Sequence, residues 1–279
     1  MREINAQLIT DKVAELCIDA NCSLPCDIRK RIEDARANEP WATAQGILDK
    51  IIENYNIADE NRAPICQDTG VACVFLKIGQ DVHINGDLTE AVNEGVRRGY
   101  RDGYLRKSVV KDPLRRVNTG DNTPAMLYIE LVPGDKIDLT VAPKGFGSEN
   151  MSRIAMLKPS DGIEGVKNFI LKTAEEAGPN PCPPIVIGVG IGGTMEKAAL
   201  LAKRALLRPL GQPNPDPRYA ALEREILEKI NATGVGPQGL GGDVTSLAVH
   251  IDFHPCHIAS MPVALNLNCH AARHAEVTL

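Results

Sequence analysis

The sequence has 279 residues, of which 43% are hydrophobic and 24% charged, so it can form a substantial globular core. Only 4% of residues are aromatic, with a single Trp, and surfaces that stack on bases or sugars are therefore not expected. The net charge is −5 and the two signs are interspersed, which argues against nucleic acid and anionic membranes as main partners.

The compartment follows from the N-terminus and the cysteines. The stretch MREINAQLITDKVAELC carries charges throughout and lacks the apolar core of a signal peptide. No apolar run approaches the ~20 residues that a membrane span needs. We therefore expect a cytoplasmic protein whose eight cysteines are thiols or metal ligands rather than disulfides.

The first half of the chain begins with helical periodicity. Within residues 5–58, three segments with apolar residues at i, i+3, i+4 and i+7 predict helices. β-branched runs at 71–84 and 125–141 predict strands. Between them, residues 88–105 have helical spacing.

The second half alternates helices and strands. Helices are predicted over 161–178, after the glycine turn that ends near 193, and over 216–232. A buried strand should precede that turn, and further strands should fill 245–268. The pattern predicts an α/β fold, with mixed α+β as the variant. We expect one catalytic domain over 1–279, with a helical part to residue 60 and then a mixed sheet with covering helices.

The glycine turn satisfies G-x-G-x-x-G through Gly188, Gly190 and Gly193. A dinucleotide site also needs an acidic residue about 20 positions on, which here falls in the proline-rich stretch LRPLGQPNPDPR. We interpret the turn instead as backbone packed under a helix, able to present N–H groups to a small anion.

The cysteines separate into two groups. Cys17, Cys22 and Cys26 lie on predicted helices and Cys73 in a predicted strand, where small buried thiols are common. Cys256, beside His257, is left open.

Three further cysteines lie in predicted loops beside polar residues. Cys66 begins the run CQDTG, Cys182 lies among four prolines, and Cys269 lies in NLNCHAARH. Three thiolates hold three irons of a [4Fe–4S] cluster and leave the fourth open to a ligand. Unrelated loop thiols would give the same spacing, so both interpretations stand at this point.

Other candidate ligands are weaker. The run HIDFHPCH lacks a matched closing pair for a zinc site. Arg106 and Lys144 precede glycine-rich turns and suit a dicarboxylate, but a solvated surface charge explains each of them alone.

Several motifs together carry a family resemblance. The segments PICQDTG, VNTG, KGFGSEN, PCPPIVIGVGIGGTMEKAALLAK, GPQGLGG and LNCHAARH occur in this order along the whole chain. The sequence resembles the α subunit, or N-terminal half, of class I fumarate hydratases, which are iron–sulfur hydro-lyases. The α subunit of L(+)-tartrate dehydratase is similar at CQDTG, at the proline-flanked cysteine and at GPQGL.

The resemblance implies a set of site residues. It implies that Cys66, Cys182 and Cys269 hold a [4Fe–4S] cluster whose open iron acts as a Lewis acid. It further implies that the dicarboxylate is bound by Gln67, Asp68, Arg106, Gly147 and His257. Of these, Asp68, Arg106 and His257 would also be catalytic.

The implied reaction is reversible hydration of fumarate to L-malate. By the same resemblance, the catalytic base is a threonine of the C-terminal half, so we expect this polypeptide alone to be inactive. A separate β subunit would complete the site in a hetero-oligomer. The alternatives are an L(+)-tartrate dehydratase α subunit forming oxaloacetate, a non-enzymatic iron–sulfur carrier or sensor, and a structural zinc protein. The tail PVALNLNCHAARH favours the fumarate interpretation.

Overall fold

The computed structural model describes all 279 residues, and its contacts divide the chain into two compact units. Unit 1 comprises Met1–Pro25, Asn54–Gly145 and Arg273–Leu279, and unit 2 comprises Cys26–Glu53 and Phe146–Ala272. The expectation of a single catalytic domain stays a prediction. No helix has the length and apolarity to cross a membrane.

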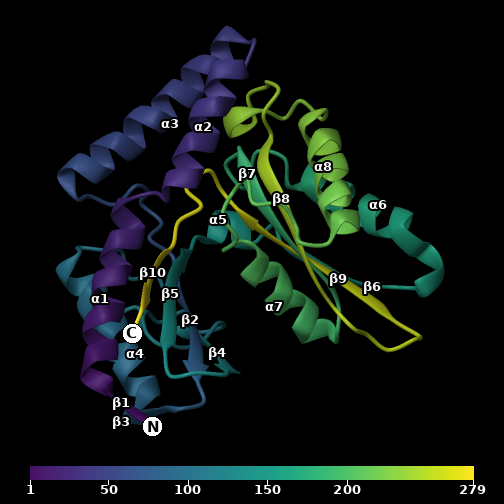
Figure 1. Cartoon of the computed structure of the whole chain (residues 1–279). Helices are drawn as coiled ribbons and strands as arrows, with labels where there is room; N and C mark the ends of the chain where they lie inside the picture. The colour runs from purple at the N-terminus through teal and green to yellow at the C-terminus, as the bar shows by residue number, and fades with distance from the viewer. The chain divides into compact units, whose positions relative to one another are not determined.

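Unit 1 is a two-layer arrangement in which α1 and α4 cover one face of a four-stranded sheet (Figure 1). The sheet order is β10-β5-β2-β4; β2 runs parallel to β4 and antiparallel to β5, which is antiparallel to β10. A short parallel pair, β1 with β3, lies apart from this sheet. The elements are β1 (Arg2–Asn5), α1 (Ala6–Cys22), β2 (Val71–Gly79), β3 (Val82–Asn85), α4 (Leu88–Asp102), β4 (Met126–Val132), β5 (Ile137–Lys144) and β10 (Ala275–Thr278).

The core of unit 1 follows from the strand period. In β2, Val74 and Leu76 point to the same face because strand side chains alternate, and both are buried in the core. They pair across the sheet with Val141 and Leu139 of β5. Ile9 and Val13 of α1 are fully buried in the same cluster, so the helix presents its apolar stripe to the sheet.

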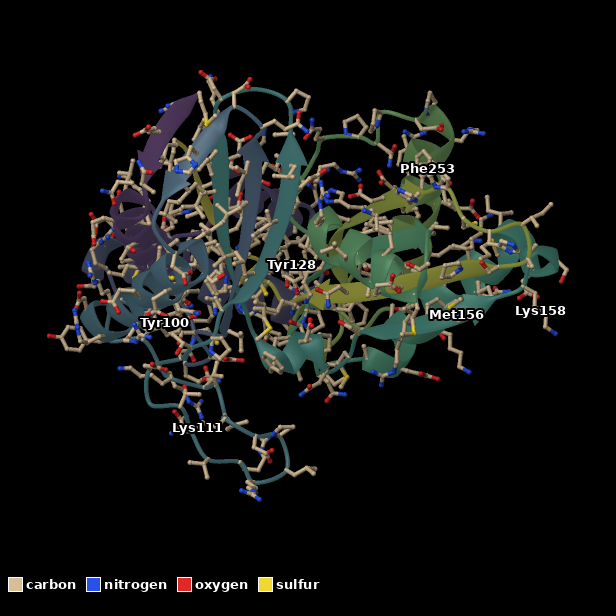
Figure 2. All side chains as sticks on the ribbon, turned by 90° about the horizontal axis from the view of Figure 1, so that it is seen from below. Tyr100, Lys111, Tyr128, Met156, Lys158 and Phe253 are labelled. Atoms are coloured by element: carbon tan, nitrogen blue, oxygen red, sulfur yellow. The ribbon has the colours of Figure 1, made fainter.

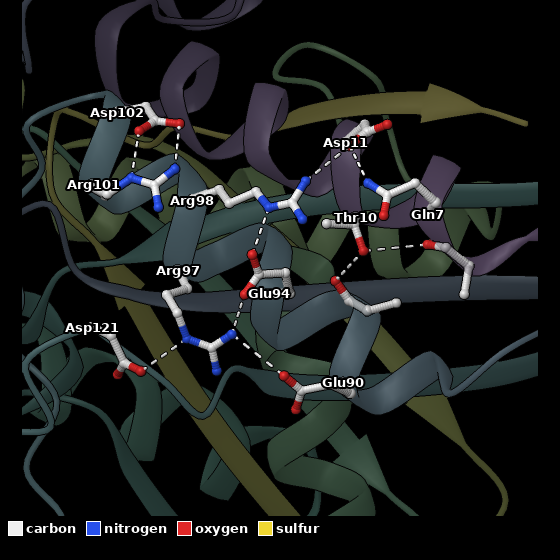
Figure 3. Close-up of polar contacts among 12 residues, drawn as sticks. Gln7, Thr10, Asp11, Glu90, Glu94, Arg97, Arg98, Arg101, Asp102 and Asp121 are labelled. Carbon is white, nitrogen blue, oxygen red and sulfur yellow. Dashed lines mark hydrogen bonds and ion pairs between the residues drawn. The ribbon is translucent and has the colours of Figure 1, made fainter.

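The outer side of α1 and α4 carries a network of charged side chains (Figure 3). Arg98 Nε donates to Glu94 at 2.6 Å, and its Nη1 lies 3.4 Å from an Asp11 carboxylate oxygen. Deeper in the seam, Thr10 Oγ1 donates to the Ala91 carbonyl at 3.0 Å. Exposed ion pairs contribute little stability, so the helix pair is held mainly by its apolar core.

Unit 2 has three layers, with α6 and α8 on one face of a four-stranded sheet and α7 on the other (Figure 1). The sheet order is β6-β9-β7-β8; β7 and β8 are parallel, and β9 is antiparallel to both β7 and β6. The helix α3 runs from unit 2 into unit 1. The elements are α2 (Cys26–Asn38), α3 (Ala42–Asn61), α5 (Phe146–Glu149), β6 (Arg153–Leu157), the 3₁₀ turn Pro159–Asp161, α6 (Gly162–Ala177), β7 (Ile185–Gly192), α7 (Met195–Ala205), α8 (Pro217–Asn231), the 3₁₀ turn Pro237–Gly239, β8 (Ser246–His254) and β9 (Met261–Asn268).

The mixed α/β fold predicted from the sequence is confirmed, and so are the long helices and the strands of the apolar runs. The helical N-terminal segment is present, and the short strand β1, which was not predicted, precedes α1. The strands β6 and β10 were not predicted. Both are short edge strands with half-exposed patterns, and such strands give a weak periodic signal.

The glycines of β7 allow α7 to pack directly on the strand. A Cβ at Gly188 would lie 2.0 Å from the Ala202 carbonyl oxygen, and one at Gly190 would lie 2.0 Å from the Ala198 oxygen. No side chain fits in that space. The G-x-G-x-x-G pattern therefore has a packing function, as interpreted from the sequence.

We expect opposite results from two glycine-to-alanine changes. Gly190→Ala should destabilise unit 2 by about 1–3 kcal/mol through overpacking, because α7 must move away from β7. Gly46→Ala is the matched control, since Gly46 lies within α3 with nothing within 4 Å of an added Cβ. It should stabilise by roughly 0.5–1 kcal/mol through helix propensity. Urea denaturation measures both, and equal effects would contradict this account.

A buried histidine lies between α7 and β8. His250 is 3% exposed, and its Nδ1 lies 3.1 Å from the Ala205 carbonyl oxygen. Burial, together with the Arg208 charge, lowers the pKa of His250 to about 4, against the opposing effects of the Ala205 hydrogen bond and of Glu223 and Asp27. The ring is therefore neutral at pH 7.

This histidine makes the stability of the fold depend on pH. Between pH 6.5 and 4, His250 becomes protonated in the unfolded chain but stays neutral in the folded one. The free energy of unfolding should therefore fall by roughly 3 kcal/mol as the pH is lowered across that window. Above pH 6.5 this contribution is fully present. His250→Asn, which keeps an N–H donor, should lose less stability over the same range. Denaturation at pH 7.5, 5.5 and 4.5 tests this. If the difference in free energy of unfolding between wild type and variant did not change with pH, the prediction would be wrong.

Candidate functional site

The Cys66 loop in unit 1 is fixed from both sides. The backbone N–H of Ile65 donates to the Asn21 carbonyl at 2.9 Å, and Asn54 Nδ2 donates to the Ile65 carbonyl at 2.9 Å. Cys66 itself is half-buried, with its Sγ 3.2 Å from Gln67 Oε1. The loop therefore holds a reachable thiol beside an amide.

The residues after Cys66 form a rigid turn. Asp68 Oδ1 accepts the backbone N–H of Gly70 at 3.0 Å, and the buried Tyr100 hydroxyl donates to the Thr69 carbonyl at 2.7 Å. Gly70 has φ +72°, and a Cβ there would lie 2.6 Å from the Lys144 backbone, so only glycine fits. Burial raises the pKa of Tyr100, which keeps its hydroxyl a donor.

Arg106 is attached to this turn through its backbone. Thr69 Oγ1 donates to the Arg106 carbonyl at 3.0 Å, and the Arg106 side chain is exposed. The structure thus groups Cys66, Gln67, Asp68 and Arg106 in one part of unit 1. Lys144, for which a solvated surface charge was the simplest interpretation, is instead buried, and its Nζ donates to the Gly145 carbonyl at 3.2 Å.

Arg273 is a buried cation at the same turn. It is 5% exposed, and its Nη2 donates to the Asp68 carbonyl. Its Nε has no hydrogen-bond partner, and no carboxylate pairs with its guanidinium. Burying an unpaired charge is costly, so this arginine lacks a counter-charge among the protein groups around it. The sequence contained the residue but no signal of its burial.

In unit 2, the loops of Cys182 and Cys269 meet. The backbone N–H of His270 donates to the Cys182 carbonyl at 3.3 Å, and His270 Nδ1 lies 3.1 Å from the same oxygen. Cys182 is exposed and has φ +54°, a left-handed conformation that costs energy in a residue with a side chain. The proline-rich loop maintains this geometry with a hydrogen bond from the Cys182 N–H to the Pro179 carbonyl at 3.0 Å.

Gln238, from the GPQGLGG segment, closes over these two loops. Its backbone N–H and its Nε2 each donate to the Pro183 carbonyl at 2.8 Å. The same Nε2 lies 3.1 Å from His270 Nδ1. The sequence marked this motif but gave Gln238 no function; its contacts show that it braces the Cys182 and His270 loops.

His257 lies in the exposed turn after β8. Its Nδ1 accepts the backbone N–H of Ala259 at 3.2 Å, so the neutral ring carries its proton on Nε2 and can donate it. The turn contributes to an open hollow of about 730 Å³ at the start of α7, together with Gly193, Lys197 and His254. Lysine and histidine here suit an anionic ligand.

Gly147 lies in the short helix α5. A Cβ at this position would lie 3.7 Å from the Asn180 carbonyl oxygen, which is an ordinary contact. Packing therefore does not require a glycine at position 147. Its place in the predicted dicarboxylate-binding set stays a prediction.

Four of the remaining cysteines, Cys17, Cys22, Cys26 and Cys73, were expected to be buried thiols. Cys17, Cys22 and Cys73 are buried, and burial raises the pKa of Cys17 to about 12. Cys26 is exposed at the start of α2, so the expectation is wrong there: at the first position of a helix its side chain escapes the packed face. Cys256, left open from the sequence, is exposed as well.

The donor set can be tested against a [4Fe–4S] cluster. No three His, Cys, Asp or Glu side chains lie close enough to hold one metal ion, but in a cluster each thiolate binds a different iron. Cys66 is half-buried and Cys182 is exposed, and the loops of Cys182 and Cys269 touch. Arg273 supplies a buried positive charge that no carboxylate pairs with, which suits an anionic group held by thiolates. The chemistry of these donors suits such a group, and their holding one stays a prediction.

Comparison with known proteins decides the family. The profile of a family described as "Fumarate hydratase (Fumerase)" matches residues 10–278. The chain belongs to the Fumerase family. The match spans both units, and so the whole chain described above.

Several proteins similar to this chain are named as α subunits. A protein of Methanocaldococcus jannaschii, provisionally named L(+)-tartrate dehydratase subunit alpha, is 47% identical over 275 residues, covering 96% of each chain. The L(+)-tartrate dehydratase subunit alpha of Escherichia coli (strain UTI89) is 32% identical over 292 residues, covering all of this chain and 96% of that protein. That of Shigella sonnei is 31% identical with the same coverage.

Proposed function

We propose that this Fumerase-family chain is the α subunit of an iron–sulfur hydro-lyase that removes water from a hydroxylated four-carbon dicarboxylate, with L(+)-tartrate as its substrate. The observation that carries the proposal is similarity over nearly the full length to proteins named as L(+)-tartrate dehydratase α subunits. These names favour the alternative over the fumarate interpretation that the sequence suggested. The product would be oxaloacetate.

The cofactor would be a [4Fe–4S] cluster held by Cys66, Cys182 and Cys269. When bound, such a cluster supplies Lewis-acid chemistry at an iron without a protein ligand. The half-buried or exposed cysteines and the unpaired Arg273 charge support this assignment.

The protein groups would bind and orient the dicarboxylate. Arg106 offers a planar fork that matches a carboxylate. His257, with its proton on Nε2, donates a hydrogen bond to a carboxylate oxygen, and charge that develops there during proton abstraction is stabilised by both groups. Gln67, Asp68 and Gly147 would complete the set that binds the dicarboxylate.

A second subunit would complete the site. The relatives are named as α subunits, so we infer a β-type partner that supplies the base for proton abstraction. The chain alone would bind the cluster and not turn over substrate.

Fumarate hydration is the second candidate function. The description of the family that matches residues 10–278 is fumarate hydratase, and the same carboxylate-binding residues would serve fumarate and L-malate. The two functions differ only in the substrate hydroxyl pattern.

The test is anaerobic co-expression with a β-type chain, followed by assays with L(+)-tartrate, fumarate and L-malate. We expect oxaloacetate from tartrate, and a substrate-induced change in the EPR spectrum of the cluster. Turnover of fumarate without any turnover of L(+)-tartrate would establish fumarate hydration, the second candidate, instead. A redox-active cluster without turnover or a substrate-induced spectral change would identify an electron carrier and overturn both.

A further inference from the structure

A protruding hairpin, residues 109–119, is not used by the proposed chemistry. The N–H of Thr119 donates to the Val109 carbonyl at 2.9 Å, and that of Lys111 donates to the Val117 carbonyl at 2.8 Å. The tip is closed by Asp112, whose Oδ1 accepts the N–H groups of the residues two and three positions on, at 2.9 and 2.6 Å. Figure 2 shows Lys111 on a loop that projects beyond the neighbouring strands.

The base of this hairpin is attached to the Cys66 loop. Asn122 is fully buried; its Oδ1 accepts the N–H of Ser108 at 2.7 Å, and its Nδ2 donates to the Gly70 carbonyl at 3.1 Å. The adjacent Asp121 accepts a hydrogen bond from Arg97 of α4 at 3.2 Å (Figure 3). The hairpin is therefore a fixed projection of the candidate site, not a loose surface loop.

The tip combines apolar and basic side chains. Leu114 is 91% exposed and Val117 is 57% exposed, which is unfavourable for groups held in water by a rigid turn. The hairpin contains three basic residues, Lys111, Arg115 and Arg116, and a single acidic one, Asp112, in a chain of net charge −5. An exposed leucine with basic residues close to it in the sequence fits an apolar notch rimmed by carboxylates.

We propose that the 109–119 hairpin is the docking element for the second subunit, whose contact surface would be an apolar notch lined by acidic side chains. The inference rests on the proposed function, because that function requires a second chain close to the Cys66 loop and Arg106. Because Asn122 joins the base of the hairpin to Gly70, a partner docked on the tip would be fixed relative to the Cys66 loop.

The experiment measures assembly directly, with the two chains purified under anaerobic conditions. Leu114→Ser should raise the dissociation constant for the second subunit by about tenfold or more through faster dissociation, as expected for a buried anchor. The double variant Arg115→Glu, Arg116→Glu should slow association by about tenfold at low salt, and added salt should narrow the difference.

Two matched controls lie elsewhere. Leu131→Ser changes a leucine that is 67% exposed at the far end of β4, and Lys172→Glu reverses an exposed charge on α6. Both should bind the partner within about twofold of wild type. Thermal unfolding of each variant chain, together with its iron and sulfide content, confirms that the fold and cluster are intact.

Three results would overturn the proposal. The first is unchanged assembly with the second subunit for both hairpin variants. The second is a change confined to self-association in sedimentation, which would assign the hairpin to contact with a second copy of this chain. The third is a raised KM with unchanged assembly, which would assign the hairpin to substrate binding. Wild-type turnover tests the hydro-lyase proposal separately, so a binding failure and a functional failure are distinguishable.

Discussion

Cys182→Ser should abolish stable iron–sulfur incorporation and reduce turnover of the assembled enzyme by at least about a thousandfold, while Cys26→Ser leaves both unchanged. Both thiols are exposed, so accessibility does not distinguish them. Cys182 differs because it is held at φ +54° and its carbonyl is bonded to the residue after Cys269. Such local strain persists where surrounding structure imposes it, and it is concentrated at functional sites.

Iron and sulfide analysis after anaerobic reconstitution measures the effect, with circular dichroism to confirm folding. Cys66→Ser and Cys269→Ser should behave like Cys182→Ser, since a hydroxyl is a poor replacement for a thiolate that ligates iron. If Cys182→Ser kept a full cluster while Cys26→Ser lost it, the ligand assignment would be wrong and the exposed α2 thiol would replace it.

The comparison of Cys26 with Cys182 shows what the sequence allowed and what it did not. Helical periodicity placed Cys26 on a helix, which is correct, but not on which side. The first position of a helix is not bound to the packed face, so the expectation of burial failed there. The proline context of Cys182, by contrast, restricted its backbone directly, and the loop that it predicted is present.

Contacts between segments far apart in the chain could not be predicted from the sequence. The sequence indicated loops for Cys182 and Cys269, but their contact depends on β7 and β9 lying side by side and antiparallel. That pairing joins segments about eighty residues apart, and local propensity carries no information on it. Gln238 and Arg273 were overlooked for the same reason. Their partners, Pro183 and Asp68, are distant in sequence, and nothing about a lone glutamine or arginine indicates burial.

The substrate was the weakest inference, for a physical reason. Groups that bind two carboxylates do so equally in fumarate, malate and tartrate, and only contacts to the hydroxyls separate them. The tail around Cys269 favoured fumarate, whereas the named relatives favour tartrate. Residues that recognise the hydroxyls through hydrogen bonds would decide the matter, because a site built for a hydroxyl strongly rejects an analogue that lacks it.

Arg273→Met should separate cluster binding from fold stability. Without a cluster, the variant should be as stable as wild type or more so, because it replaces a buried charge that has no counter-ion with an apolar side chain. With the cluster, we expect activity or iron affinity to fall about tenfold to a hundredfold, the usual cost of losing an outer-shell contact. The reduction potential of the cluster should also shift downward, since a nearby cation favours the more negative reduced form.

Arg273→Lys is the matched control for charge. It keeps the cation but lacks the fork that donates to the Asp68 carbonyl, so it should restore the potential more than the activity. A structural arginine would behave differently: both variants would lower the stability of the cluster-free chain and leave the potential of any remaining cluster unchanged. Urea denaturation without iron, alongside a potential titration of the loaded protein, distinguishes the two. Arg273 is 5% exposed and no carboxylate pairs with it, so the proposed anionic cluster would supply the counter-charge that the protein groups do not.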